Sequence, residues 1–98
     1  MATYVLMTKL SPDIATQMKD RAAIGRAWID RVHEKCPGVK FISHYAVLGP
    51  YDFLDIYEAP DEEAAAKVSL ISMANGAQKA ESWVALPYKR MLELAEEI

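Results

Sequence analysis

The strongest constraint on the fold of this chain is the segment Tyr45–Lys67, which reads YAVLGPYDFLDIYEAPDEEAAAK. An apolar run ends at Gly49-Pro50-Tyr51-Asp52, and a second alternating run follows at once. Two such runs joined by a short turn are typical of an antiparallel hairpin. Pro60 and the acids after it then favour a helix start. The segment therefore predicts a hairpin followed by a helix that crosses back over the sheet.

The residues before this segment predict a strand, a helix and the start of the hairpin. Tyr4–Leu10 has the composition of a strand, and Ser11-Pro12-Asp13 carries the signals of a helix N-terminus. We expect this helix to run to about Lys35, where Cys36-Pro37-Gly38 stops it. Its apolar residues recur at helical spacing: Ile14, Met18, Ala22, Gly25, Ile29, Val32 and Cys36.

The residues from the hairpin onward predict two more helices and a last strand. The hairpin strands are Val39–Leu48 and Asp52–Glu58. The crossover helix starts at Pro60 and is closed by Gly76, which suits a left-handed cap. A fourth strand, Ala77–Leu86, precedes an amphipathic helix that begins at Pro87 and carries an apolar stripe: Tyr88, Met91, Leu92 and Ala95.

This order of elements is β-α-β-β-α-β, the order of the ferredoxin-like split βαβ unit. Right-handed crossovers place both helices on one face of a four-stranded antiparallel sheet with spatial order 4-1-3-2. We therefore predict an α+β, ferredoxin-like βαββαβ sandwich plus a C-terminal helix, with residues 1–98 as a single domain. The other face of the sheet is left to water, to the C-terminal helix or to another subunit.

Alternation along the strands predicts which side chains occupy that open face. We expect the aliphatic Leu54 and Ile56 to meet the helices. The opposite set is aromatic and charged and is expected on the open face: Phe53, Asp55, Tyr57, Lys79, Glu81 and Trp83. The second strand has two possible registers, with either Phe41, Ser43 and Tyr45 or Ile42 and His44 on this face. So aromatic a surface indicates an interface or a ligand pocket, and we expect a homodimer with facing sheets, or a larger ring.

Composition excludes some functions. A net charge of −3, with basic residues spread along the chain, disfavours nucleic-acid binding. No apolar run approaches the roughly 20 residues that cross a bilayer. The start of the chain is strand-like and lacks the basic region of a secretory signal, and a single cysteine, Cys36, suits a reducing compartment. We expect a cytoplasmic protein.

The turn and both segments that flank it resemble the GYD domain family. Gly49-Pro50-Tyr51-Asp52 matches the Gly-x-Tyr-Asp turn of that family, and the segments TYVLMTKLSPD and EAPDEEAAAKV are similar to it in the same order. The resemblance covers residues 2–87, with the C-terminal helix as an addition. It implies a small ferredoxin-like domain related to the dimeric α/β-barrel group. It implies no reaction and no catalytic residues, only the turn.

The turn residues admit a structural and a functional interpretation. Gly49 would permit an unusual, strained backbone conformation, and Asp52 would accept hydrogen bonds from nearby amides. Alternatively, Tyr51 and Asp52 line the mouth of a ligand pocket as hydroxyl donor and acceptor.

Each of the other candidate site residues also has both a structural and a functional interpretation. His44 is either a buried neutral side chain or a functional residue, as a general base or as a metal or haem ligand. Asp55 and Glu81 are either an acid pair or members of salt bridges. Tyr57 and Trp83 either stack on a flat ligand or pack against a partner subunit. His33 and Cys36 alone make a poor zinc site, and we expect no metal and no cofactor.

Three classes of function stay open. The first is a small-molecule-binding or sensory module with its pocket between facing sheets. The second is a cofactor-independent enzyme, an oxygenase, isomerase or decarboxylase, with His44 or Asp55 as base and Tyr51 or Tyr57 as hydrogen-bond donor. The third is a structural or assembly protein whose open face serves only to oligomerise. We favour the first, because no catalytic motif is strong.

Overall fold

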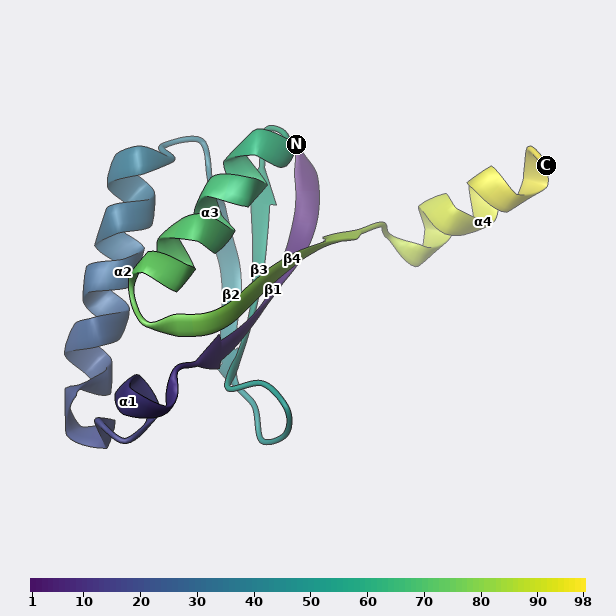
Figure 1. The fold of residues 1–98 in the computed structure, drawn as a ribbon. Helices are drawn as coiled ribbons and strands as arrows, with labels where there is room; N and C mark the ends of the chain where they lie inside the picture. The colour runs from purple at the N-terminus through teal and green to yellow at the C-terminus, as the bar shows by residue number, and fades with distance from the viewer.

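One antiparallel sheet and two covering helices make up the body of the molecule, seen in a computed structural model that describes residues 1–98. The sheet order is β2-β3-β1-β4, the predicted order read from the opposite edge. Helices α2 and α3 lie on the same face of the sheet (Figure 1). The strands are β1 (Ala2–Leu10), β2 (Lys40–Ala46), β3 (Phe53–Ala59) and β4 (Ala77–Ala85), and the helices are α1 (Pro12–Ala15), α2 (Arg21–Lys35), α3 (Glu62–Ala74) and α4 (Tyr88–Glu96). The predicted ferredoxin-like fold is confirmed.

The sequence predicted one continuous helix from Pro12 to Lys35, but in the structure this helix is interrupted between α1 and α2. Its N-terminus is as predicted, with the Ser11 hydroxyl accepting a hydrogen bond from the amide of Ile14 at 3.4 Å. After α1 the side chains of Thr16 and Gln17 both donate to the carbonyl of Asp13, at 2.9 and 3.3 Å. Such side-chain bonds compete with the helical N–H for the same carbonyl. A short 3-10 turn, Met18–Asp20, then leads into α2.

The other boundaries differ from the predictions by a few residues. The N-cap of α3 is Asp61, one residue after Pro60, and its carboxylate accepts from the amide of Ala64 at 2.9 Å. Strand β2 ends at Ala46, so Val47 and Leu48 belong to the hairpin loop.

The core lies between the sheet and the helices and is organised by two tyrosines. The rings of Tyr4 and Tyr57 stack with their centroids 5.4 Å apart. Tyr57 is fully buried, and its hydroxyl donates to Ser82 Oγ at 2.7 Å. Burial raises the pKa of Tyr57 to about 12, so this hydroxyl stays a donor at neutral pH. The buried core residues are Tyr4, Leu6, Val32, Cys36, Val39, Tyr57, Ala59, Ala65 and Val68.

The predicted orientation of β3 is wrong. Phe53, Asp55 and Tyr57 face the helices, and Leu54 and Ile56 lie on the open face. The polar groups of the inward set are satisfied, because Asp55 pairs with His44 and the Tyr57 hydroxyl bonds to Ser82. A buried polar group that finds its partner carries little penalty. On β4 the prediction is right, with Lys79, Glu81 and Trp83 on the open face.

A β-bulge settles the register of β2. Phe41 lies opposite Tyr57, but Ser43 lies opposite Ile56, which leaves Ile42 as the extra residue. Phe41 and His44 therefore both face the helices, and Ser43 and Tyr45 face the open side. Neither of the two unbroken alternations considered for this strand is the observed one.

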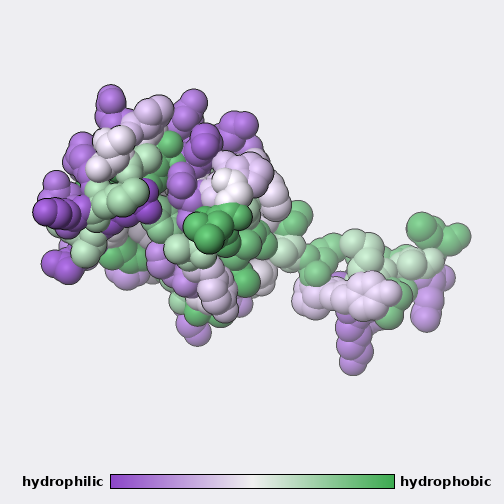
Figure 2. Space-filling view, turned by 90° about the horizontal axis from the view of Figure 1, so that it is seen from below, coloured by the Kyte–Doolittle hydropathy of each residue, from purple (hydrophilic) through white to green (hydrophobic).

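Helix α4 does not cover the open face of its own chain. It projects from the end of β4 as a separate arm (Figure 1), and none of its residues is buried. Hydrophobic residues gather along one side of this arm and hydrophilic residues along the other (Figure 2). The large side chains Tyr88, Met91 and Leu92 of this helix are all exposed.

The glycine that adopts a backbone conformation unfavourable for other residues is Gly76, not Gly49. Gly76 has φ +105°, and a Cβ there would lie 2.7 Å from Ile14 Cγ1. Gly49 has no positive φ and open space around it, so the expected strained turn is wrong.

We expect Gly76→Ala to lower the free energy of unfolding by about 1–3 kcal/mol, through backbone strain and the clash with Ile14. Urea denaturation measures this change. The matched control is Gly49→Ala, which should stay within about 0.5 kcal/mol of the wild type. Equal losses in both variants would contradict the assignment.

Candidate functional site

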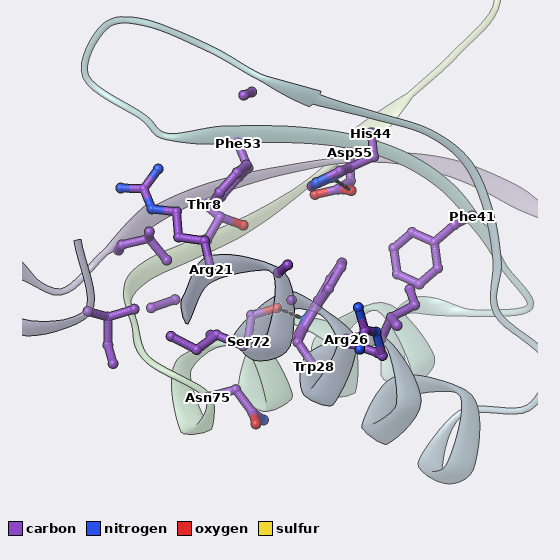
Figure 3. A pocket seen from close by; sticks show the side chains of 18 residues that line it. Thr8, Arg21, Arg26, Trp28, Phe41, His44, Phe53, Asp55, Ser72 and Asn75 are labelled. Carbon is purple, nitrogen blue, oxygen red and sulfur yellow. Dashed lines mark hydrogen bonds and ion pairs between the residues drawn. The ribbon is translucent and has the colours of Figure 1, made fainter. Parts of the chain in front are cut away.

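A groove of about 730 Å³ runs between α2 and the helix-facing side of the sheet (Figure 3). Its floor is formed by side chains from β1, β2 and β3, and its walls by α2 and the end of α3. Ligand pockets in proteins commonly measure about 300–1,000 Å³. The groove is lined by Thr8, Leu10, Ile14, Arg21, Ala22, Ile24, Gly25, Arg26, Trp28, Ile29, Phe41, His44, Ala46, Phe53, Asp55, Ser72, Asn75 and Ala77.

The groove exists because the apolar stripe of α2 changes in size along the helix. Val32 and Cys36, at and just beyond the C-terminal end, are buried in the core. The equivalent positions nearer the start are Ala22 and Gly25, which remain exposed. These side chains are too small to reach the sheet, so the space below them is unfilled.

Trp28 stands in the middle of α2 and connects three elements. Its indole N–H donates to Ser72 Oγ on α3 at 2.8 Å. Its ring meets the edge of Phe41 at 5.2 Å and lies 6.4 Å from the ring of His44, centroid to centroid. Trp28 thus closes one side of the groove and fixes the distance between α2 and β2.

His44 and Asp55 form a pair on the floor of the groove. Asp55 is 2% exposed, and its Oδ1 is hydrogen-bonded to His44 Nδ1. Burial raises the pKa of Asp55 above its usual 3.8, although the nearby His44 opposes the shift. With its Nδ1 proton donated to Asp55, a neutral His44 presents Nε2 as an acceptor. Such a pair can bind a donor or act as a general base.

Two arginines of α2 lie along the same groove. Arg21 Nη2 donates to the carbonyl of Ala15 at 3.1 Å, and its guanidinium carbon lies 5.9 Å from the centroid of the Phe53 ring. Arg26 lines the groove farther along the helix (Figure 3). The Phe53 ring also stacks with the His44 ring, with the two centroids 5.4 Å apart.

The open face carries a second cluster, built from residues predicted as ligand-binding. Glu81 Oε1 accepts from both the Tyr51 hydroxyl and Trp83 Nε1, each at 3.0 Å. The two aromatic rings meet edge to face at 6.3 Å. The bond to Glu81 raises the pKa of Tyr51 above its usual 10.0. The structure therefore brings Tyr51, Glu81 and Trp83 together.

The remaining predicted residues lie elsewhere. Asp52 joins the hairpin loop to β1, because its Oδ2 accepts from the amide of Leu10 at 2.8 Å. Tyr57 is enclosed in the core on the other face of the sheet. Asp55 and Glu81 are on opposite faces, so the acid pair considered for the open face is not formed.

Sequence reasoning singled out His44 and Asp55 but did not identify the groove around them. It missed Trp28, Arg21 and Ser72 as site residues. The available signal was the pair of small residues, Ala22 and Gly25, within the apolar stripe of α2. No group of three or more His, Cys, Asp or Glu is placed to hold a metal ion, and no helix is long and apolar enough to span a bilayer.

Comparison with known proteins confirms the family resemblance. Residues 4–95 match the GYD domain family, so the match includes most of α4, which the sequence had suggested to be an addition. A relative from Thermus thermophilus, named glutamine synthetase and cystathionine beta-lyase binding protein, is 33% identical over 88 residues, covering 89% of this chain and 90% of the relative.

Two solved structures share the fold. One, also of a protein from Thermus thermophilus, superimposes with a TM-score of 0.57 at 21% identity, over 89% of this chain and 95% of that one. A hypothetical protein from Pyrococcus horikoshii does so with a TM-score of 0.53 at 18% identity, over 89% and 92%.

The raised pKa of Asp55 gives a prediction with a definite sign. The folded state holds the Asp55 proton to a higher pH than the unfolded chain does. This contribution to stability is complete below the unfolded pKa and is lost as pH rises through the folded pKa. The unfolding free energy of the wild type should therefore fall relative to that of Asp55→Asn as pH rises from the usual aspartate pKa of 3.8 towards neutrality. Urea denaturation at several pH values measures the difference, and a rise across this range would contradict it.

Proposed function

The chain belongs to the GYD domain family, and we propose that it is a small-molecule-binding domain whose ligand occupies the groove between α2 and the sheet. The observation that carries this proposal is the groove itself. It combines a ligand-sized volume with apolar walls and a few convergent polar groups, the usual character of a binding site.

The polar groups of the groove are suited to orienting a ligand. His44 is held by a buried partner, and Trp28 is held by Ser72, so both rings are positioned before any ligand arrives. Preorganised groups lose less conformational freedom on binding. The proposed site lies on the face opposite to the pocket between facing sheets that the sequence suggested.

We propose that the open face is the interface of a homo-oligomer, most simply a dimer. Its central part is aliphatic, with Val5, Leu54 and Ile56 side by side on neighbouring strands. Tyr45 and Trp83 extend this surface and are 56% and 47% exposed. Exposed apolar surface of this kind commonly marks an interface.

A second candidate function is the binding of other proteins. The Thermus thermophilus relative is named for binding two enzymes, and the present chain is 33% identical to that protein over 88 residues. The unpartnered hydrophobic side of α4 would suit such a role (Figure 2).

The groove proposal is tested by NMR with a library of small molecules added to ¹⁵N-labelled protein. The chain has two tryptophans, Trp28 in the groove and Trp83 on the open face, and each gives its own indole N–H signal. We expect ligands to shift the Trp28 signal. Gly25→Phe, which puts a ring into the groove, should abolish the shift.

Gly25→Ala is the matched control for that variant. A Cβ at Gly25 meets nothing within 4 Å, so alanine should leave binding intact and stabilise α2 by about 0.5–1 kcal/mol. Ligands that shift only the Trp83 signal would contradict the groove and support a pocket between facing sheets.

The interface proposal predicts that Trp83→Glu gives monomers or aggregates, because a charge would enter an apolar contact. Size-exclusion chromatography with light scattering measures the oligomer. Ala23→Glu, on an exposed part of α2, is the control and should keep the wild-type mass. A stable oligomer of native size in Trp83→Glu would count against the open face.

A further inference from the structure

The charges that line the groove are unbalanced. Its basic residues are Arg21 and Arg26, and neither takes part in an ion pair. The one acidic residue that lines it, Asp55, is already paired with His44. The groove therefore offers positive charge without a matching free carboxylate.

Arg21 also has an unmet hydrogen-bond donor. Its Nη2 is bonded to the carbonyl of Ala15, but its Nε is buried and has no acceptor. Across the whole chain it is the one buried side-chain nitrogen or oxygen without a partner. Native structures satisfy nearly all such groups, so the hydrogen bonding of Arg21 is incomplete. Because Nε is closed to solvent, a ligand in the groove would reach the guanidinium through the free Nη1.

The surface next to Arg21 is aromatic. Phe53 lies under the guanidinium, and the rings of Trp28 and Phe41 follow along the groove (Figure 3). Flat apolar groups pack well against such rings. A ligand with an acidic group at one end and a ring at the other would satisfy both features.

We propose that the groove binds a small carboxylic acid with an apolar, ring-sized body, and this inference rests on the proposed function. The carboxylate forms an ion pair with the Arg21 guanidinium and accepts a hydrogen bond from its free Nη1. The ring lies against Phe53 and Trp28. The Asp55 carboxylate is 2% exposed and hydrogen-bonded to His44, and the two arginines outnumber it, so the groove stays net positive toward the ligand.

The test compares acids with their neutral amides, which have almost the same shape. Isothermal titration calorimetry is run with phenylacetate and phenylacetamide, and with indole-3-acetate and its amide. We expect each acid to bind at least tenfold more tightly than its amide. Acetate, which has the charge without the ring, should bind more weakly than phenylacetate.

Two arginine variants locate the charge. Arg21→Met should weaken binding of the acids at least tenfold and leave the amides unchanged. Arg31→Met is the matched control, since Arg31 lies on the same helix and does not line the groove. The Trp28 indole signal should shift with the acids, and the Trp83 signal should not.

The outcomes separate this inference from the proposed function. Amides that bind as tightly as acids, and lose binding in Gly25→Phe, would leave the groove as a binding site and overturn the carboxylate. Acids that bind equally well to Arg21→Met would overturn the role of Arg21. If neither the acids nor the amides shift the Trp28 indole N–H signal, the inference is also overturned. The NMR screen with the small-molecule library then decides whether the groove is a binding site at all.

Discussion

The position of Trp28 is the constraint on which the rest of the helical layer depends. Its indole is held at one end by Ser72 and rests near Phe41 and His44, so α2 cannot approach β2 any closer. Beyond this ring the helix turns Val32 into the core. Before it, Ala22 and Gly25 are too short to follow. The C-terminal half of α2, after Trp28, is therefore packed against the sheet. The N-terminal half, before Trp28, leaves the groove open.

The same face of the sheet tolerates an unusual number of polar groups because each has a partner from another strand or helix. Asp55 has His44, and the Tyr57 hydroxyl and Ser82 share a chain of bonds that reaches Ser69 on α3. A buried hydroxyl or carboxylate that is fully bonded can replace an aliphatic residue at modest cost. The aliphatic residues of β3 are therefore free to lie on the other side, where they shape an apolar surface.

This arrangement explains which features could be predicted from the sequence. Turn signals around Gly49 and Gly76, together with Pro12, suffice for the order of elements, and hence for the sheet topology. Alternation in β3 divides its residues into two sets but does not say which set faces the helices. That choice depends on the hydrogen bonds of Asp55 to His44 and of Tyr57 to Ser82. Both bonds join residues that are distant in sequence, so the sequence pattern does not reveal them. The bulge in β2 and the groove under α2 also depend on contacts between residues that are distant in sequence. The turn motif has a structural account: Tyr51 ties the loop to β4 through Glu81, and Asp52 ties it to β1.

Helix α4 illustrates how a short element depends on its surroundings. It has nine residues, whereas isolated helices below about 12–15 residues are marginal in water. Its hydrophobic side meets no surface of its own chain (Figure 1). The helical content of this arm will therefore follow the concentration of whatever surface covers it, as in segments that fold on contact. A partner surface that covers the hydrophobic side would stabilise the helix and the assembly together.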